Sequence, residues 1–240
     1  MKILAFECSA SPASVAIIDN GKIIASEFMN IKTTHSQTLL PMCENVLKKS
    51  GININDIEGL AVAAGPGSFT GIRIGISVVK GLAAPKNLPC ARVSTLEALA
   101  QPFTDEDCIV CPVMDARCKQ LYNALFEIKN GEIIRLCFDR AILFDELLDE
   151  LKTNYSKKSK IILCGDGADI FSSYLNNKIS NVYKANEILK YQNAVNVALL
   201  SEKIFKDNKA VKYDELLPFY LRLPQAEREL NAKKSEESNK

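Results

Sequence analysis

Apolar runs of strand length, separated by turn residues, fill the beginning of the chain. These runs occupy residues 3–6, 14–18 and 22–29. Asn20-Gly21 lies between the second and third runs, and this pair favours the tight turn of a β-hairpin. The pattern therefore predicts three consecutive strands, of which the last two form a hairpin.

The second half of the chain repeats this order of strands and turn. The matching segments are the runs 109–114, 121–128 and 132–138 and the turn at Asn130-Gly131, and each half then adds a helix and a strand, at 60–64 or 161–164. Two such hairpins can recur by chance, but the matched order favours duplication. We therefore predict a duplicated α/β fold of two related subdomains with a cleft between them.

The expected division of the chain follows from this repeat. We place the first subdomain at residues 1–104 and the second at 105–224. From residue 225 the composition becomes charged and repetitive, which is typical of a disordered tail.

The first predicted helix begins near Thr34. Thr34 and Gln37 have the spacing of a capping box, and Ser50-Gly51 is a typical helix end. Pro41 removes a backbone hydrogen bond, so we expect a kink or a restart there. The apolar stripe of this helix consists of Leu39, Leu40, Cys43, Val46 and Leu47.

A glycine-rich run, Gly-Pro-Gly-Ser-Phe-Thr-Gly-Ile-Arg-Ile-Gly at 65–75, connects a predicted strand to a helix at 70–83. It contains no Gly-Lys-Ser/Thr, and its glycines miss the dinucleotide spacing by one residue. Three roles remain open for this loop. It can collect an anion at the helix N-terminus, hold another protein, or only turn the chain.

The helix at 70–83 is apolar almost all round, as in a buried helix. Gly71, Gly75 and Gly81 each weaken it by about 1 kcal/mol relative to alanine. Gly71 and Gly75 form one smooth stripe, so a closely packed neighbour must offset this weakness. That neighbour is either the chain's own sheet or a helix of another subunit.

The composition is that of a soluble globular protein, with 240 residues, 47% hydrophobic and 25% charged. A net charge of +1 argues against strong binding to nucleic acid by this chain alone, but it leaves a role beside an RNA-binding partner open. No apolar run reaches the length of a membrane span. The absence of a secretory signal and the presence of eight cysteines that look like core residues lead us to expect a cytoplasmic protein with free thiols.

Cys108-x-x-Cys111 with Cys118 is the one cluster that resembles a metal site. It lacks a second cysteine pair and a nearby histidine, and strand alternation would point Cys108 and Cys111 to opposite faces. We therefore expect no metal. His35 is the only histidine, so no second imidazole is available to share a metal, and no Gly-x-Ser-x-Gly motif supplies a nucleophile for a catalytic triad.

Three acids, Glu7, Asp115 and Asp166, follow apolar runs and should stand at the carboxyl ends of strands. Open α/β sheets place ligands there. Three converging carboxylates could hold a hydrated Mg²⁺ with a nucleotide, whereas acids at strand ends can also be solvated or cap turns. Both interpretations remain open from the residues alone.

Several stretches together resemble the TsaB family, also called YeaZ. They are residues 2–7, His-Ser-Gln-Thr-Leu-Leu-Pro at 35–41, the glycine-rich run at 65–75, Val-Ser-Thr-Leu at 93–96, Asp-Ala-Arg at 115–117, and Pro218-x-Tyr220-Leu221-Arg222. The resemblance covers nearly all of residues 1–224. It implies an actin-like fold, of the sugar kinase and Hsp70 type.

The resemblance also implies a function and partners. The family takes part in bacterial synthesis of N6-threonylcarbamoyladenosine in tRNA. There the paralogous TsaD subunit transfers the threonylcarbamoyl group, TsaB is its required partner, and the TsaE ATPase joins the pair. A homodimer is a further expectation for the chain when that partner is absent.

The chain departs from the TsaD-type paralogues at their metal-binding His-x-x-x-His, which here corresponds to Thr95 and Leu99. Neither side chain can replace an imidazole ligand. The resemblance therefore implies a non-catalytic subunit with no cofactor of its own, apart from weak or interface-shared nucleotide. Glu7 and Cys8 also replace the Asp-Thr common at this point. The residues of such a vestigial nucleotide cleft would be Glu7, Gly65, Gly67, Ser68, Asp115, Arg117 and Asp166.

In proteins of this type the first two helices pack against the equivalent pair of TsaD. The resemblance assigns the corresponding residues here to partner binding: Leu39, Leu40, Cys43, Val46, Gly71, Ile72, Gly75, Ile76 and Val79. Two other functions stay open as alternatives. One is a free-standing ATP-dependent phosphotransferase of the actin-like superfamily, and the other, with less support, is a peptidase.

Overall fold

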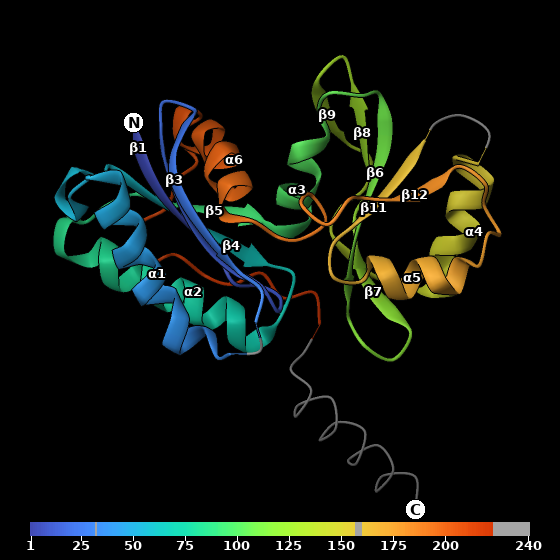
Figure 1. The fold of residues 1–240 in the computed structure, drawn as a ribbon, viewed down its shortest axis with the longest axis horizontal. Coiled ribbons are helices and arrows are strands. Elements are labelled where there is room, and N and C mark those ends of the chain that lie inside the picture. Colours follow the sequence, from blue (N-terminus) through green and yellow to red (C-terminus); the bar gives the residue numbers. More distant parts are fainter. Residues whose placement is uncertain (32, 157–159, 223–240) are drawn as a thin grey trace, which may run out of the picture.

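The computed structural model describes residues 1–31, 33–156 and 160–222 (Figure 1). The charged tail expected from residue 225 lies outside these ranges. Two α/β subdomains lie side by side, each built on one sheet (Figure 1). No helix within the described ranges is long and apolar enough to cross a membrane.

The first subdomain contains a five-stranded sheet in the order β3-β2-β1-β4-β5. Its strands are β1 (Lys2–Glu7), β2 (Ala13–Asp19), β3 (Lys22–Met29), β4 (Gly59–Gly65) and β5 (Cys90–Ser94). Helices α1 (His35–Ser50) and α2 (Phe69–Ala83) cover one face, where their apolar side chains form a core with β1, β2 and β4. Short 3₁₀ turns occupy Ile54–Asp56 and Ala84–Lys86.

The second subdomain contains a sheet in the order β10-β7-β6-β11-β12. Its elements are β6 (Cys108–Asp115), β7 (Gln120–Asn123), β8 (Phe126–Lys129), β9 (Glu132–Arg135), β10 (Arg140–Leu143), β11 (Ile161–Cys164), β12 (Val182–Lys184), α4 (Phe144–Asn154) and α5 (Ala168–Leu175). Helices α4 and α5 cover one face, while α3 (Thr95–Ala100) and the 3₁₀ turn Gln101–Phe103 pack on the other.

The predicted duplication is confirmed by the pairing of strands. β6 pairs with β8 along its first half and with β7 along its second, so β7 and β8 together take the place of β2. The turns at Asn20-Gly21 and Asn130-Gly131 are therefore equivalent, and all four residues have left-handed backbone angles. The predicted single strand at 121–128 is interrupted at Ala124-Leu125, and β10 was not predicted.

The predicted boundary between the subdomains is wrong at its C-terminal side. Helix α6 (Ala194–Lys206) packs on the second face of the first sheet, against β1, β2, β4 and β5 (Figure 1). Val211 and Cys90 then form a β-bridge. The chain thus returns to the first subdomain near residue 194, because the apolar face of the first sheet would otherwise stay exposed.

The predicted C-terminal end of helix α1 is confirmed, but the predicted capping box at its N-terminus is not. Thr34 is the N-cap residue, yet its side chain caps no backbone group. The helix continues through the exposed Pro41 and ends at Gly51, whose left-handed φ of 68° suits glycine.

Candidate functional site

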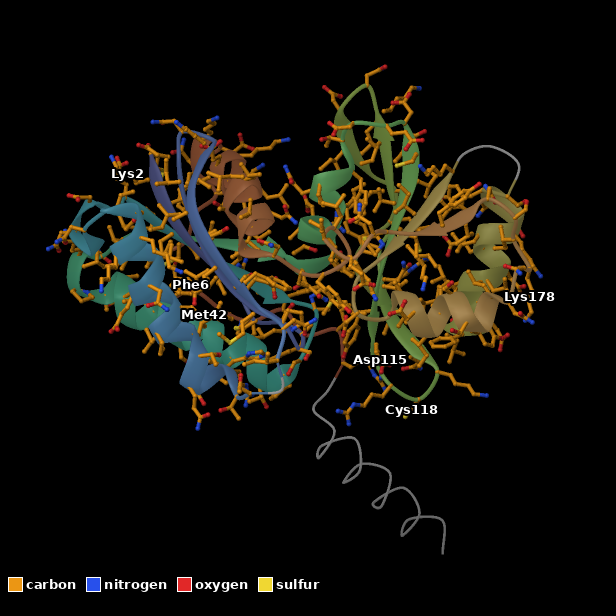
Figure 2. All side chains as sticks on the ribbon, viewed as in Figure 1. Lys2, Phe6, Met42, Asp115, Cys118 and Lys178 are labelled. Atoms are coloured by element: carbon orange, nitrogen blue, oxygen red, sulfur yellow. The ribbon has the colours of Figure 1, made fainter. Side chains whose placement is uncertain are left out.

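A polar cavity of about 600 Å³ lies between the two subdomains. Its walls come from the β1–β2 turn, the glycine-rich loop before α2, the ends of β6 and β11, and residues 219–222. Figure 2 shows Asp115 and Cys118 at the tip of β6 and the following turn, beside the end of the described chain. The predicted cleft between the two halves is therefore present.

The glycine-rich loop is held by other segments of the same chain. A Cβ atom on Gly65 would lie 2.3 Å from the carbonyl oxygen of Phe219, and one on Gly67 would lie 2.4 Å from that of Ser9. Ser68 donates its backbone N–H to the Ser9 carbonyl at 2.6 Å, and its hydroxyl caps α2 by accepting from the Gly71 N–H at 3.3 Å. The glycines thus permit close packing of backbone on backbone, as a structural turn requires.

The three predicted acids do not converge on the cavity. Asp115 and Asp166 line it, but Glu7 is completely buried and does not. Within residues 1–31, 33–156 and 160–222, no three His, Cys, Asp or Glu side chains are arranged to hold a metal ion. The structure therefore does not form the three-carboxylate Mg²⁺ site that the strand ends suggested.

Burial changes the acidity of two of these groups. It raises the pKa of Glu7 to about 7 and the pKa of Asp166 to about 6, because a charged carboxylate loses its hydration there. One Glu7 oxygen accepts from the Ser9 N–H at 2.6 Å, and the other has no hydrogen-bond partner. The side-chain amide of Gln192 donates to Asp166 at 3.0 Å. Asp115 instead turns back to accept from the N–H of Arg117 at 2.8 Å.

The two residues that the resemblance sets in place of a histidine pair lie in the interior. Thr95 and Leu99 are fully buried on α3, and Leu99 belongs to the core between α3 and the second sheet. The lone His35 places its Nε2 atom 2.7 Å from the carbonyl oxygen of Ala10, so it holds the β1–β2 turn in place.

All eight cysteines are free thiols. Cys108 and Cys111 belong to cores on opposite faces of the second sheet, as predicted.

The predicted partner-binding residues mostly face the chain's own core. Those buried on α1 and α2 are Leu39, Cys43, Val46, Gly71, Ile72, Gly75, Ile76 and Val79. A Cβ atom on Gly71 would meet the Cys8 carbonyl oxygen at 2.1 Å, and one on Gly75 would meet the Cys8 sulfur at 2.9 Å. The glycine stripe therefore packs against the turn that follows β1, and Gly75 also approaches Val62 of β4, which corrects the expectation that the stripe faces a partner.

Of the predicted set only Leu40 is exposed, with 47% of its surface accessible. The outward side of the two helices carries a groove of about 440 Å³ near the start of α2. We call this the α1–α2 groove, and it is lined by Ser36, Phe69, Thr70, Arg73, Ile74, Ser77 and Val78. No sequence signal distinguishes this face of α2, since the helix is apolar on nearly every side.

Comparisons with known proteins agree on one group of relatives. A protein-family model described as TsaD, tRNA N6-adenosine threonylcarbamoyltransferase, matches residues 22–230. The tRNA threonylcarbamoyladenosine biosynthesis protein TsaB of Escherichia coli is 31% identical over 92% of this chain and 95% of its own length. TsaB of Bacillus subtilis is 29% identical, over 95% and 96% respectively. The solved structure of YeaZ from Pseudomonas aeruginosa, 24% identical, superposes with a TM-score of 0.77 over 92% of this chain and 99% of its own, which shows a shared fold.

Proposed function

Because this chain belongs to the TsaB (YeaZ) family, within the wider family of TsaD-type tRNA N6-adenosine threonylcarbamoyltransferases, we propose that it acts in the synthesis of threonylcarbamoyladenosine in tRNA. Its role there is that of a required accessory subunit, which binds a TsaD-type transferase and supports its activity. The TsaE-type ATPase and the tRNA belong to the same complex.

One observation carries the non-catalytic role. At the positions where the resemblance places the paralogue's metal-binding histidines, this chain has Thr95 and Leu99, both fully buried. A threonine and a leucine offer no pair of imidazole nitrogens, and their burial leaves no open coordination position. The only histidine is engaged elsewhere, by the β1–β2 turn. The chemistry of transfer is therefore assigned to the partner.

The α1–α2 groove supports the proposed mode of docking. The half-buried Ile74 and Val78 give this groove apolar lining, and Leu40 adds exposed apolar surface on α1 outside the groove. Helices with such a shared groove bind other helices by filling it with apolar side chains. We propose that the equivalent helices of the TsaD-type paralogue occupy it. Docking would then shift the partner toward its active arrangement by binding that state more tightly.

A phosphotransferase remains the alternative, since the interdomain cavity is polar and holds Asp115 and Asp166. Against it, the third carboxylate, Glu7, is completely buried and does not line the cavity. The proposed accessory role is tested by mixing the purified chain with the TsaD-type protein of the same organism. Co-elution in size-exclusion chromatography supports it. Separate elution at micromolar concentrations of both proteins would contradict it.

A further inference from the structure

The last described residues cross from one subdomain to the other. We call residues 218–222 the strap. The N–H of Phe219 donates to the carbonyl of Ala64 at the end of β4, at 2.7 Å. Arg222 donates through Nη1 to the carbonyl of Ala116 just after β6, also at 2.7 Å. The strap is thus bonded to both subdomains, and it forms one wall of the cavity between them.

A stack of three side chains holds the strap against α2. The rings of Phe69 and Tyr220 lie nearly parallel, with centroids 4.4 Å apart. The guanidinium carbon of Arg73 lies 3.9 Å from the centroid of the Phe69 ring, and its Nε donates to the Tyr220 hydroxyl at 2.8 Å. Within the described part of the chain, Arg73 forms no ion pair with a carboxylate. Stacking and this one hydrogen bond therefore fix its position.

The same stack separates the cavity from the α1–α2 groove. Phe69 lines both hollows, Arg73 lines the groove, and Tyr220 lines the cavity. A protein seated in the groove would touch Phe69 and Arg73 directly. Tyr220 does not line the groove, so these two residues are the link from a protein seated there to Tyr220 and the strap.

We propose that the Arg73–Phe69–Tyr220 stack couples docking in the α1–α2 groove to the strap, so that a docked protein fixes the strap across the interdomain cleft. The coupling rests on the proposed function, because the docked protein is the TsaD-type paralogue. Tyr220 is accordingly a positioning residue. It acts on the partner through Arg73 and Phe69, and it gives the motif Pro218-x-Tyr220-Leu221-Arg222 a role.

Coupling of this kind is reciprocal: if docking favours the bonded strap, the bonded strap must favour docking by the same factor. Tyr220→Leu removes the ring and the hydroxyl without altering a residue that lines the groove. We expect it to weaken binding of the paralogue about fivefold, a factor in the usual range of coupling between sites. Tyr183→Leu is the matched control, since Tyr183 is an exposed tyrosine on β12 of the second subdomain.

The test is hydrogen exchange of the peptide spanning residues 214–222, measured with and without saturating paralogue. In the natural chain, complex formation should slow exchange there at least about threefold, and Tyr220→Leu should abolish this slowing while Tyr183→Leu leaves it intact. Tyr220→Phe keeps the stack and loses only the hydrogen bond from Arg73, so it gives a graded result if the leucine variant does not fold.

The outcomes separate the two proposals. A complex that forms without slower exchange in the strap overturns the coupling and leaves the proposed function standing. Equal affinities of the Tyr220→Leu and natural chains would also overturn it. Failure of the natural chain to bind the paralogue overturns both.

Discussion

Glu7 occupies an unusual position for a carboxylate, at the end of β1 and completely buried. One of its oxygens has no hydrogen-bond partner, so the neutral acid suits the site better than the anion. Its pKa is correspondingly raised from 4.5 to about 7. Ionised Glu7 therefore destabilises the folded state at neutral pH, and its side chain is not a ligand in the cleft.

The raised pKa fixes the direction of a pH effect on stability. Between about pH 4.5 and 7 the folded state holds a proton that the unfolded state has lost, so the free energy of unfolding falls as pH rises through this window and then levels off. Glu7→Gln should flatten this fall and be more stable than the natural chain at pH 8, by up to about 3 kcal/mol. The raised pKa of Asp166 acts in the same direction and remains in both proteins.

Urea denaturation at pH 5 and pH 8 measures this difference. The control is Glu132→Gln, which alters an exposed glutamate at the start of β9 and should leave the pH dependence unchanged. Equal pH dependence in the Glu7→Gln and natural chains would show that Glu7 is not the group responsible.

Residue identity alone was enough to predict part of the candidate site. The lack of a second histidine is visible in the sequence, and so is the Thr95–Leu99 replacement. The burial of Glu7 was not predictable, because a strand-end acid faces the cleft or the interior according to the packing of the following turn. Here that turn is fixed by the contacts of Ser9 with Glu7 and Ser68.

The two sides of helix α2 have different surroundings. Its glycine stripe allows close approach to Cys8, while its opposite side forms the α1–α2 groove. The sequence predicted the helix at 70–83, close to its observed range, because an apolar run follows the glycine-rich turn. The cap that Ser68 provides was not predicted. It could not predict which face is covered, because a helix that is apolar all round has no hydrophobic direction.

The glycines of α2 should therefore respond differently to the same substitution. Gly71→Ala places a methyl group against the Cys8 carbonyl, and we expect a loss of at least about 2 kcal/mol in the free energy of unfolding. Gly81→Ala meets nothing within 4 Å and should stabilise the helix by up to about 1 kcal/mol. Thermal unfolding of the two variants compares them directly. A Gly71→Ala protein as stable as Gly81→Ala would refute the packing of the stripe against Cys8 in the turn after β1.

The outward face of α1 and α2 has its own test. Leu40→Glu should leave the melting temperature nearly unchanged, since Leu40 is half exposed, and weaken binding of the TsaD-type paralogue at least about tenfold by burying a charge. Ile170→Glu, at a similarly exposed isoleucine on α5, is the matched control and should bind normally. Titration calorimetry gives both affinities. Equal loss in the two variants, or none in Leu40→Glu, would remove the outward face of α1 at Leu40 from the interface.

At the scale of the whole molecule, the duplicated order of strands was predictable because each half carries the same local turn signals. The return of α6 to the first sheet was not, since no local signal states which of two exposed faces a helix will cover. The predicted boundary failed for this reason. The strap was not predicted either, because its contacts with Ala64 and Phe69 join residues far apart in the sequence.

The molecule as a whole should bind nucleotide weakly. Only two of the three expected carboxylates, Asp115 and Asp166, line the interdomain cavity. In the glycine-rich loop, the Ser68 N–H donates to the Ser9 carbonyl and is therefore not free to bind a phosphate. We expect calorimetry of the isolated chain with Mg-ATP to give a dissociation constant above about 1 mM, with no hydrolysis. Micromolar binding with turnover would instead support the phosphotransferase.

The most direct measurement is transfer of threonylcarbamoyl to tRNA in a mixture reconstituted from purified proteins, with each subunit omitted in turn. We predict no modified tRNA from this chain in the absence of the TsaD-type subunit, and a large loss of product when this chain alone is left out. Modified tRNA produced by this chain without the TsaD-type subunit, or undiminished product in its absence, would contradict its assignment as a required partner without chemistry of its own.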